Sequence, residues 1–149
     1  MAAVEQGEAI NSSYFYVRFD DLNVAAFREI SGIGSENDVV VQHQVNSEGK
    51  ASYVKTAGKL GWQNLVLKKG IDTSLSLWEW RNTIITKGVD GQRKNGEIFI
   101  VDVKGTQQTT WKIVNAWPCN YVVGALVPDT SEMLLEEIHL AHEGLERVK

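Results

Sequence analysis

The sequence predicts a mainly β protein with one helix, and three observations support this fold class. Apolar and polar residues alternate with a period of two along most of the chain. Asp-Gly and Asn-Gly pairs, which favour tight turns, separate some of these segments. One segment, around residues 73–87, shows clear helical periodicity instead. At 149 residues with 43% apolar content, the chain suits one domain that buries its own core.

The N-terminal third begins with a tail and continues in strands. Residues 1–13 show no regular pattern and are expected to precede a single domain over residues 14–149. Strand-like segments follow at residues 14–20, 24–34 and 38–45. The first, YFYVRFD, sets three apolar residues on one face, and these are predicted core positions: Phe15, Val17 and Phe19.

Residues 45–61 interrupt the β pattern. The segment is polar and its glycines are spaced along it, so the pattern predicts a long loop. Loops of this length within one domain are usually functional or disordered. We therefore expect this excursion to take part in function.

Residues 73–87 are predicted to form the helix. Asp72 or Thr73 is a candidate N-cap, and Ser76-x-x-Glu79 matches a capping box. Five residues fall on one face of this helix and are expected to turn towards the core: Leu77, Trp78, Arg81, Ile84 and Ile85.

The second half of the chain alternates again. Residues 97–104 and 109–117 are separated by a short loop and predict a β-hairpin, which the pair Trp117-Pro118 is expected to end. The remaining predicted core positions are Leu65 and Leu67 before the helix and Phe99, Val101, Trp111 and Ile113 after it. Several strands carry large apolar side chains on both faces, which favours cover by another subunit.

The C-terminal segment, SEMLLEEIHLAHEGLERVK, is ambiguous. Its composition favours a helix, and an apolar stripe fits helical spacing: Leu134, Leu135, Ile138, Ala141 and Leu145. As a strand it alternates less cleanly. The local pattern alone therefore predicts a helix.

Composition excludes several classes of function. A net charge of −4 and a pI near 5.4 leave no basic footprint for nucleic-acid recognition. The one cysteine, Cys119, cannot form an internal disulfide and fits a reducing compartment. The start of the chain does not match a secretory signal, and no apolar run is long enough for a membrane anchor, so we expect assembly in the cytoplasm.

Candidate chemistry is sparse. His139-x-x-His142, with Glu136 and Glu143 nearby, could hold a metal on a helix, but on a strand the two imidazoles would face opposite sides. No motif surrounds Cys119. No nucleophile, base and oxyanion site come together, so neither an enzyme nor a cofactor is expected. The alternative is a monomeric β-sandwich that binds carbohydrate or another ligand through exposed tryptophans: Trp62, Trp78, Trp80 or Trp117.

The order of the motifs resembles a known family. Along the chain come YFYVRFD, AAFREISGIGSENDVV, KLGWQNLVLKKGID, a helix around LWEW, WKIVNAWPCNY and SEMLLEEIHLAHEGLE. This order resembles the tail-tube proteins of contractile-tailed phages and phage-tail-like contractile injection systems. The resemblance covers nearly the whole chain, from Tyr14 to Leu145.

The resemblance implies a fold and an assembly. Two antiparallel sheets would pack as a sandwich or small barrel with one flanking helix, and the C-terminal segment would be a strand. Subunits would form six-membered rings that stack into a hollow tube inside a contractile sheath. The parent particle would be a phage virion or a bacterial injection device that conducts DNA or protein effectors.

The resemblance also implies partners and contact residues. The chain would meet copies of itself, the sheath protein, a baseplate or tube initiator, a tape-measure protein, a terminal cap and cargo in the lumen. The excursion over residues 45–61 would reach the adjacent ring, with these candidate contacts: Ser47, Glu48, Lys50 and Tyr53. Trp111 and Ile113 would pack in the core. The helix with Trp78 and Trp80 would cover one side of the core or pack towards a neighbouring subunit.

Overall fold

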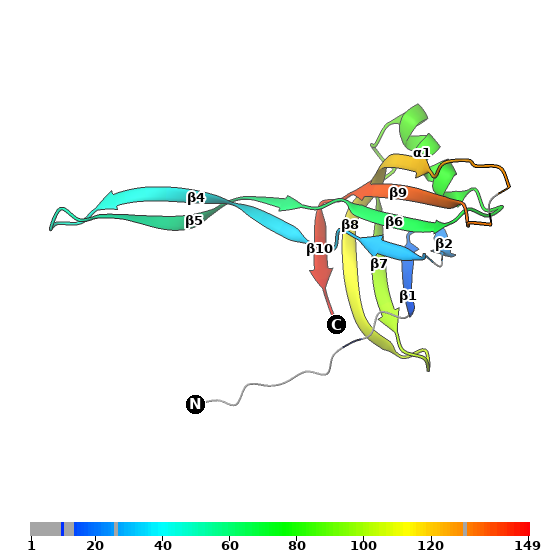
Figure 1. Ribbon diagram of the computed structural model, residues 1–149, viewed down its shortest axis with the longest axis horizontal. Helices are drawn as coiled ribbons and strands as arrows, with labels where there is room; N and C mark the ends of the chain where they lie inside the picture. Colours follow the sequence, from blue (N-terminus) through cyan, green and yellow to red (C-terminus); the bar gives the residue numbers. More distant parts are fainter. Residues whose placement is uncertain (1–9, 11–13, 26, 130) are drawn as a thin grey trace.

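The fold is mainly β, which confirms the predicted class. The structure is a computed structural model that describes residues 10, 14–25, 27–129 and 131–149 (Figure 1). Its strands are β1 (Tyr14–Phe19), β2 (Leu22–Ala25), β3 (Glu29–Ser31), β4 (Ser35–Val45), β5 (Ala51–Trp62), β6 (Leu65–Gly70), β7 (Lys94–Val101), β8 (Gln107–Val123), β9 (Leu135–Ala141) and β10 (Gly144–Arg147). The helix, α1, spans Ser76–Lys87. Apart from Ile10, the predicted tail over residues 1–13 lies outside the described residues.

The long strand β8 joins two antiparallel sheets. Its first half pairs with β7 and β10, and its second half pairs with β9. Between the halves, Asn115 adopts a φ of 51°, and its backbone N–H donates to Asn95 Oδ1 at 3.0 Å. The first sheet contains β2, β1, β7, β8 and β10, and the second contains β8, β9, β6 and β3. In Figure 1 the strands of the second sheet run across those of the first.

The hydrophobic core lies between the two sheets. Residues from the first sheet meet residues from the second in a single buried cluster. The cluster consists of Val17, Phe19, Phe27, Leu65, Leu67, Leu77, Trp80, Ile98, Ile113, Ala116, Ile138 and Leu140. Phe15 and Trp111 are partly buried and pack against it. Strict alternation in β6 and β9 sends every second side chain inward, so local pattern and packing agree there.

Strand β7 faces the core in the opposite sense to the prediction. Ile98, rather than Phe99 or Val101, belongs to the central cluster. Phe99 and Val101 are buried on the other face of the first sheet, where the Phe99 ring stacks on Tyr16 at a centroid distance of 5.6 Å. Both faces of β7 are apolar, so alternation could not decide which face turns inward.

Helix α1 begins at Ser76, with Leu75 as its N-cap and no side-chain capping bond, so the predicted capping box is wrong. Its buried residues are Leu77, Trp80 and Ile84. Trp78, predicted to cover the core, is 44% exposed. Trp80 takes the inner position because its ring packs on Phe19 and its indole N–H donates to the Gln92 carbonyl at 3.1 Å.

Two strand boundaries also differ from the prediction. Pro118 does not end β8 but is fully buried within it, beside an irregularity in the β8–β9 pairing that accommodates its missing N–H. Trp117 lies opposite Ala141 and is half-buried outside the central cluster. The C-terminal segment forms β9 and β10, so the helix predicted from local pattern is wrong and the strand implied by the resemblance is observed.

Candidate assembly surfaces

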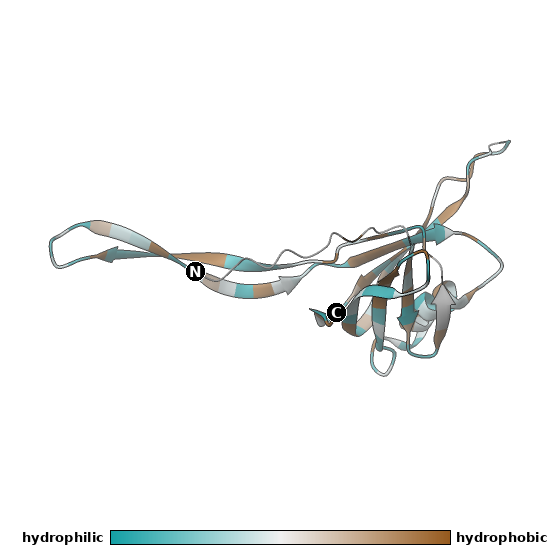
Figure 2. Cartoon of the chain, turned by 90° about the horizontal axis from the view of Figure 1, so that it is seen from below, coloured by the Kyte–Doolittle hydropathy of each residue, from teal (hydrophilic) through white to brown (hydrophobic). Residues whose placement is uncertain are grey.

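The most exposed part of the protein is the hairpin formed by β4 and β5. These strands pair with each other from Ser35–Trp62 to Val45–Ala51 and form a sheet of their own. The ribbon projects far from the sandwich along the longest axis of the molecule (Figures 1 and 2). The predicted loop over residues 45–61 is therefore wrong in its local structure, because Ala51–Trp62 is a strand and only residues 46–50 form the connecting turn.

The two faces of this hairpin differ in polarity. Directly opposed residues share a face, and successive pairs alternate between faces. One face, called here the apolar face, carries Val39, Val41, His43, Val45, Ala51, Tyr53, Lys55 and Ala57. The other carries Val40, Gln42, Gln44, Ser52, Val54 and Thr56. All of these residues are exposed, including Val45 at 73% and Tyr53 at 66%.

The tip of the hairpin is closed by its own backbone. Asn46 Oδ1 accepts hydrogen bonds from the N–H groups of Glu48 at 3.0 Å and Lys50 at 2.9 Å, and the Asn46 N–H donates to the Lys50 carbonyl. Ser47 is exposed at the tip, and Tyr53 lies two residue pairs below it against His43. The side chains of Ser47, Glu48 and Lys50 are thus presented on a preformed turn, and that of Tyr53 lies on the adjoining strand β5.

The root of the hairpin is held against the sandwich. Gly32 has a φ of 85°, and a side chain there would collide with the carbonyl of Asn64, so the two chain segments cross at a point where glycine is required. The Gln63 N–H donates to the Gly34 carbonyl at 3.2 Å. His142 lies 2.9 Å from the Gln63 carbonyl through Nε2, and its ring packs beside Trp62. These contacts set the direction in which the hairpin projects.

A second apolar surface lies at the other end of the sandwich. The connection between β8 and β9 lines a cavity of about 690 Å³, formed by residues 124–128 and 132–135 and called here the end pocket. Leu126, Val127 and Met133 of this pocket are 78%, 60% and 62% exposed. In Figure 1 this connection lies opposite the tip of the hairpin. Exposed apolar groups of this kind are typical of interaction surfaces.

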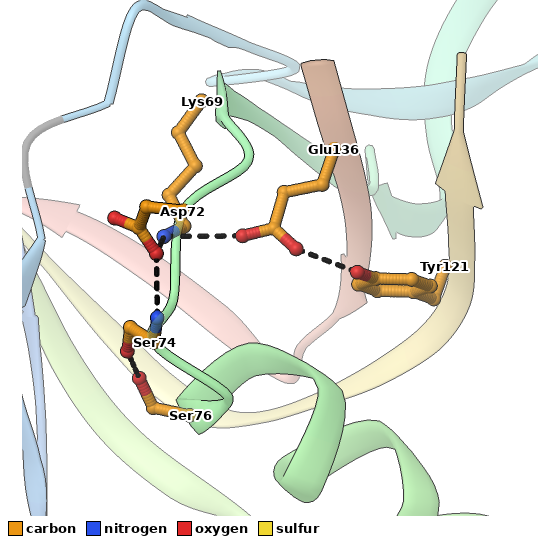
Figure 3. Close-up of polar contacts among 6 residues, drawn as sticks. All are labelled: Lys69, Asp72, Ser74, Ser76, Tyr121 and Glu136. Carbon is orange, nitrogen blue, oxygen red and sulfur yellow. Dashed lines mark hydrogen bonds and ion pairs between the residues drawn. The ribbon is translucent and has the colours of Figure 1, made fainter. Parts of the chain in front are cut away.

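A buried polar network supports the second sheet close to the end pocket (Figure 3). Lys69 and Glu136 lie opposite each other on β6 and β9, and Lys69 Nζ is 3.1 Å from Glu136 Oε1. Lys69 Nζ is also 3.3 Å from Asp72 Oδ1, and the Tyr121 hydroxyl donates to Glu136 Oε2 at 2.5 Å. Burial, followed by the hydrogen bond and charge of Glu136, raises the pKa of Tyr121 to about 12.

The two histidines considered as candidate metal ligands do not come together. His139 Nε2 lies 2.6 Å from Glu137 Oε1 on the same strand, whereas His142 contacts the backbone at the root of the hairpin. Within the described part of the chain, no three His, Cys, Asp or Glu side chains are placed to hold a metal ion. Cys119 is half-buried, and its Sγ lies 3.5 Å from the His139 carbonyl.

The tryptophans of the alternative, ligand-binding hypothesis do not form a common platform. Trp80 is buried, Trp62 lies against His142, and Trp117 is half-buried on β8. Trp78 is exposed but its ring edge contacts Tyr121 at a centroid distance of 5.4 Å. None of the described helices combines the length and apolar character needed to cross a membrane.

Comparison with known families identifies the chain. Residues 11–146 match the family described as the T4-like virus tail tube protein gp19. The chain belongs to this family. Most of its length is included in the match, so both the sandwich and the projecting hairpin are parts of a tail tube protein. No curated protein matches the chain.

Solved structures share the fold of this tail tube protein. One is a chain of the extracellular contractile injection system PVC in its extended sheath–tube complex, with a TM-score of 0.79 and 23% identity over 93% of this chain and 90% of that one. The tube-terminating cap of the anti-feeding prophage gives a TM-score of 0.79 and 20% identity over 98% of this chain and 95% of that one. Hcp1 from Flavobacterium johnsoniae is more distant, with a TM-score of 0.56 and 13% identity over 91% of this chain and 94% of that one.

Proposed function

We propose that this tail tube protein is a structural subunit of the inner tube of a contractile particle and that it forms six-membered rings which stack into a hollow tube. The observation that carries the proposal is the β4–β5 hairpin, whose apolar face has no cover from its own chain among the described residues. A two-stranded ribbon is at best marginally stable alone in water. Contact with another subunit would both stabilise this ribbon and connect neighbouring rings.

Sheet edges support closure of the ring. The second sheet ends at β3 on one side, and residues 117–123 of β8 pair only with β9 among the described strands. Both edges therefore present backbone groups that a neighbouring subunit could pair with. Joined edge to edge around a ring, second sheets would form one continuous barrel, which leaves no free edge.

Charged and polar residues on the outer face of the second sheet suit a channel wall. Lys68 pairs with Glu29 at 3.1 Å, and His139 contacts Glu137 on the same sheet. The net charge of −4 would limit adhesion of acidic cargo, either DNA or an acidic protein effector. The proposed partners are the sheath around the tube, the baseplate or initiator, the tape-measure protein and the terminal cap. The particle is a phage virion or a bacterial injection device, assembled in the cytoplasm.

The hairpin is also proposed to make the contact between rings. Ser47, Glu48, Lys50 and Tyr53 lie at or near its tip. Most N–H groups of the turn already have acceptors within it, so the side chains remain for contacts with another subunit. The apolar face behind the tip supplies the area that such contacts need. No catalytic role is proposed for any of these residues.

The test is to shorten the hairpin. Residues 42–54 are replaced by Asn-Gly, which joins the opposed residues Val41 and Lys55 by a two-residue turn. Negative-stain microscopy at high concentration should show tubes for the unaltered protein and separate rings for the shortened one. The substitution Gln44→Ala on the opposite face of the hairpin is the matched control and should leave tubes intact. Long tubes from the shortened protein would contradict the proposal.

A further inference from the structure

The hairpin and the end pocket mark the two ends of the second sheet. β5 leads into β6 at Leu65, which pairs with Leu140 near the root of the hairpin. β6 ends at Gly70, which pairs with Leu135 in the wall of the end pocket. The strands of this sheet therefore run between the hairpin root and the pocket, along the same axis as the hairpin, which projects from the root in the opposite direction (Figure 1).

Copies that stack in one orientation must join unlike ends. A contact between two different surfaces of the same protein is heterologous, and its repetition builds an open stack. A hairpin that projects from one end of a subunit will then meet the opposite end of a subunit in the next ring. In this protein the opposite end carries the end pocket.

We propose that the apolar face of the hairpin docks into the end pocket of a second copy in the adjacent ring. The inference rests on the proposed stacking function and adds its receptor, which is the surface around Leu126, Val127 and Met133. Both surfaces are apolar and exposed in the single chain, so their contact would remove apolar area from water on each side. The end pocket is thus assigned to a second copy of this protein.

The charges of the two surfaces are complementary. Residues 39–57 of the hairpin carry Lys50, Lys55 and Glu48, a net charge of +1 with histidine neutral. The connection over residues 124–135 carries Asp129 and Glu132 and no lysine or arginine, a net charge of −2. Charges of opposite sign around an apolar contact favour one partner and one orientation over others.

The first experiment places a charge on each surface separately. Val45→Asp alters the apolar face of the hairpin, and Leu126→Asp alters the end pocket. Val103→Asp is the matched control, because Val103 is also an exposed valine, at 83%, but lies in the β7–β8 turn. Negative-stain microscopy should show rings without tubes for the first two variants and tubes for the control.

The outcomes separate this inference from the proposed function. Tubes from Val45→Asp as well as from the shortened hairpin would overturn both, because the hairpin would not connect rings. Rings from Val45→Asp together with tubes from Leu126→Asp would leave the stacking role intact and overturn the docking site. The pocket would then be assigned to another occupant, such as a neighbour in the same ring or a sheath subunit.

Mixing the two variants tests the pairing directly. Rings of Leu126→Asp retain an intact hairpin, and rings of Val45→Asp retain an intact end pocket. The hairpins of a Leu126→Asp ring can therefore dock into the end pockets of a Val45→Asp ring. The outer surfaces of this pair of rings then carry only altered pockets and altered hairpins, so no third ring can be added. The mixture should contain stacks of two rings that neither variant forms alone, and only single rings in the mixture would overturn the inference.

Cross-linking gives a measurement that does not depend on a defect in assembly. Tyr53→Cys and Leu126→Cys are combined in a Cys119→Ser background and the concentrated protein is oxidised. Denaturing gels without reductant should show a ladder of linked subunits, and a Val103→Cys replacement for Leu126→Cys should not. Absence of the ladder from the Tyr53–Leu126 pair would overturn the inference even if the charged variants failed to form rings.

Discussion

The hairpin and the second sheet are continuous in sequence, but the hairpin is exposed to solvent whereas the second sheet packs against the core. β5 runs into β6 after two residues, yet β6 alternates between buried and half-buried residues whereas nearly all of β5 is exposed. Both segments contain large apolar residues, Tyr53, Val54 and Leu60 in β5 and Leu65, Val66 and Leu67 in β6. The comparison teaches that apolar content predicts a need for cover, but not whether the cover comes from the same chain or from another copy.

The largest contrast should appear when a core residue is compared with one on the hairpin. Ile138→Ala removes a fully buried side chain from β9 and should lower the free energy of unfolding by about 2–5 kcal/mol. Val45→Ala on the hairpin should change that free energy by about 0.5 kcal/mol or less, because the residue is exposed. Urea unfolding of unassembled subunits, followed by tryptophan fluorescence, measures both; similar losses would remove the distinction between the two regions.

A smaller loss is expected in the polar network at the far end of the second sheet. Glu136→Gln should leave the buried Lys69 ammonium with Asp72 as its remaining anion and lower stability by up to about 3 kcal/mol. The double variant Lys69→Met with Glu136→Leu removes both charges and should recover much of this loss. If the double variant were less stable than Glu136→Gln, the buried pair would itself be a net stabilising interaction.

The same network should make the stability of the sandwich depend on alkaline pH. The folded protein holds the Tyr121 proton up to a pKa of about 12, above the ordinary value of 10.0, so the unfolded chain binds fewer protons between these pH values. The contribution of the protonated Tyr121 to the free energy of unfolding is therefore fully present below pH 10 and is lost as the pH rises towards 12. Tyr121→Phe should lower stability by about 1 kcal/mol at neutral pH and reduce the fall above pH 10. If the free energy of unfolding fell equally above pH 10 in the unaltered protein and in Tyr121→Phe, Tyr121 would not be the group responsible.

Amide hydrogen exchange in the hairpin should show the clearest effect of assembly. This measurement involves the smallest effect on the isolated subunit. Hydrogen exchange within residues 39–57 should be fast in separate subunits, since nothing in the described chain covers this ribbon. Assembly into tubes should slow it, while amides of β9 should exchange slowly in both states. Equally slow exchange in subunits and tubes would show that the ribbon is stable without a partner.

Much of this fold could be predicted from local sequence, but the failures have specific causes. β6 sets Leu65 and Leu67 on one face against Lys68 on the other, so its inward face follows from alternation. β7 is apolar on both faces, so its orientation depends on pairing with β1 and β8. Helix α1 carries Trp78 and Trp80 near its start, and packing against Phe19 decides which of them is buried. The C-terminal segment has helical composition, but pairing with β6 and β8 overrides it.

By itself the sequence determined the fold class, the β7–β8 hairpin and, through the order of its motifs, the family. It did so because alternation and turn residues act over short distances along the chain. Only the tertiary structure decided that residues 51–62 form a strand, that Lys69 is buried with Glu136, and that an apolar pocket lies opposite the hairpin. Lys69 and Glu136 lie far apart in sequence, so their contact leaves no local periodic signal. Residues 51–62 pair with the nearby β4, but their polar, glycine-spaced sequence lacks the alternation that predicts a strand.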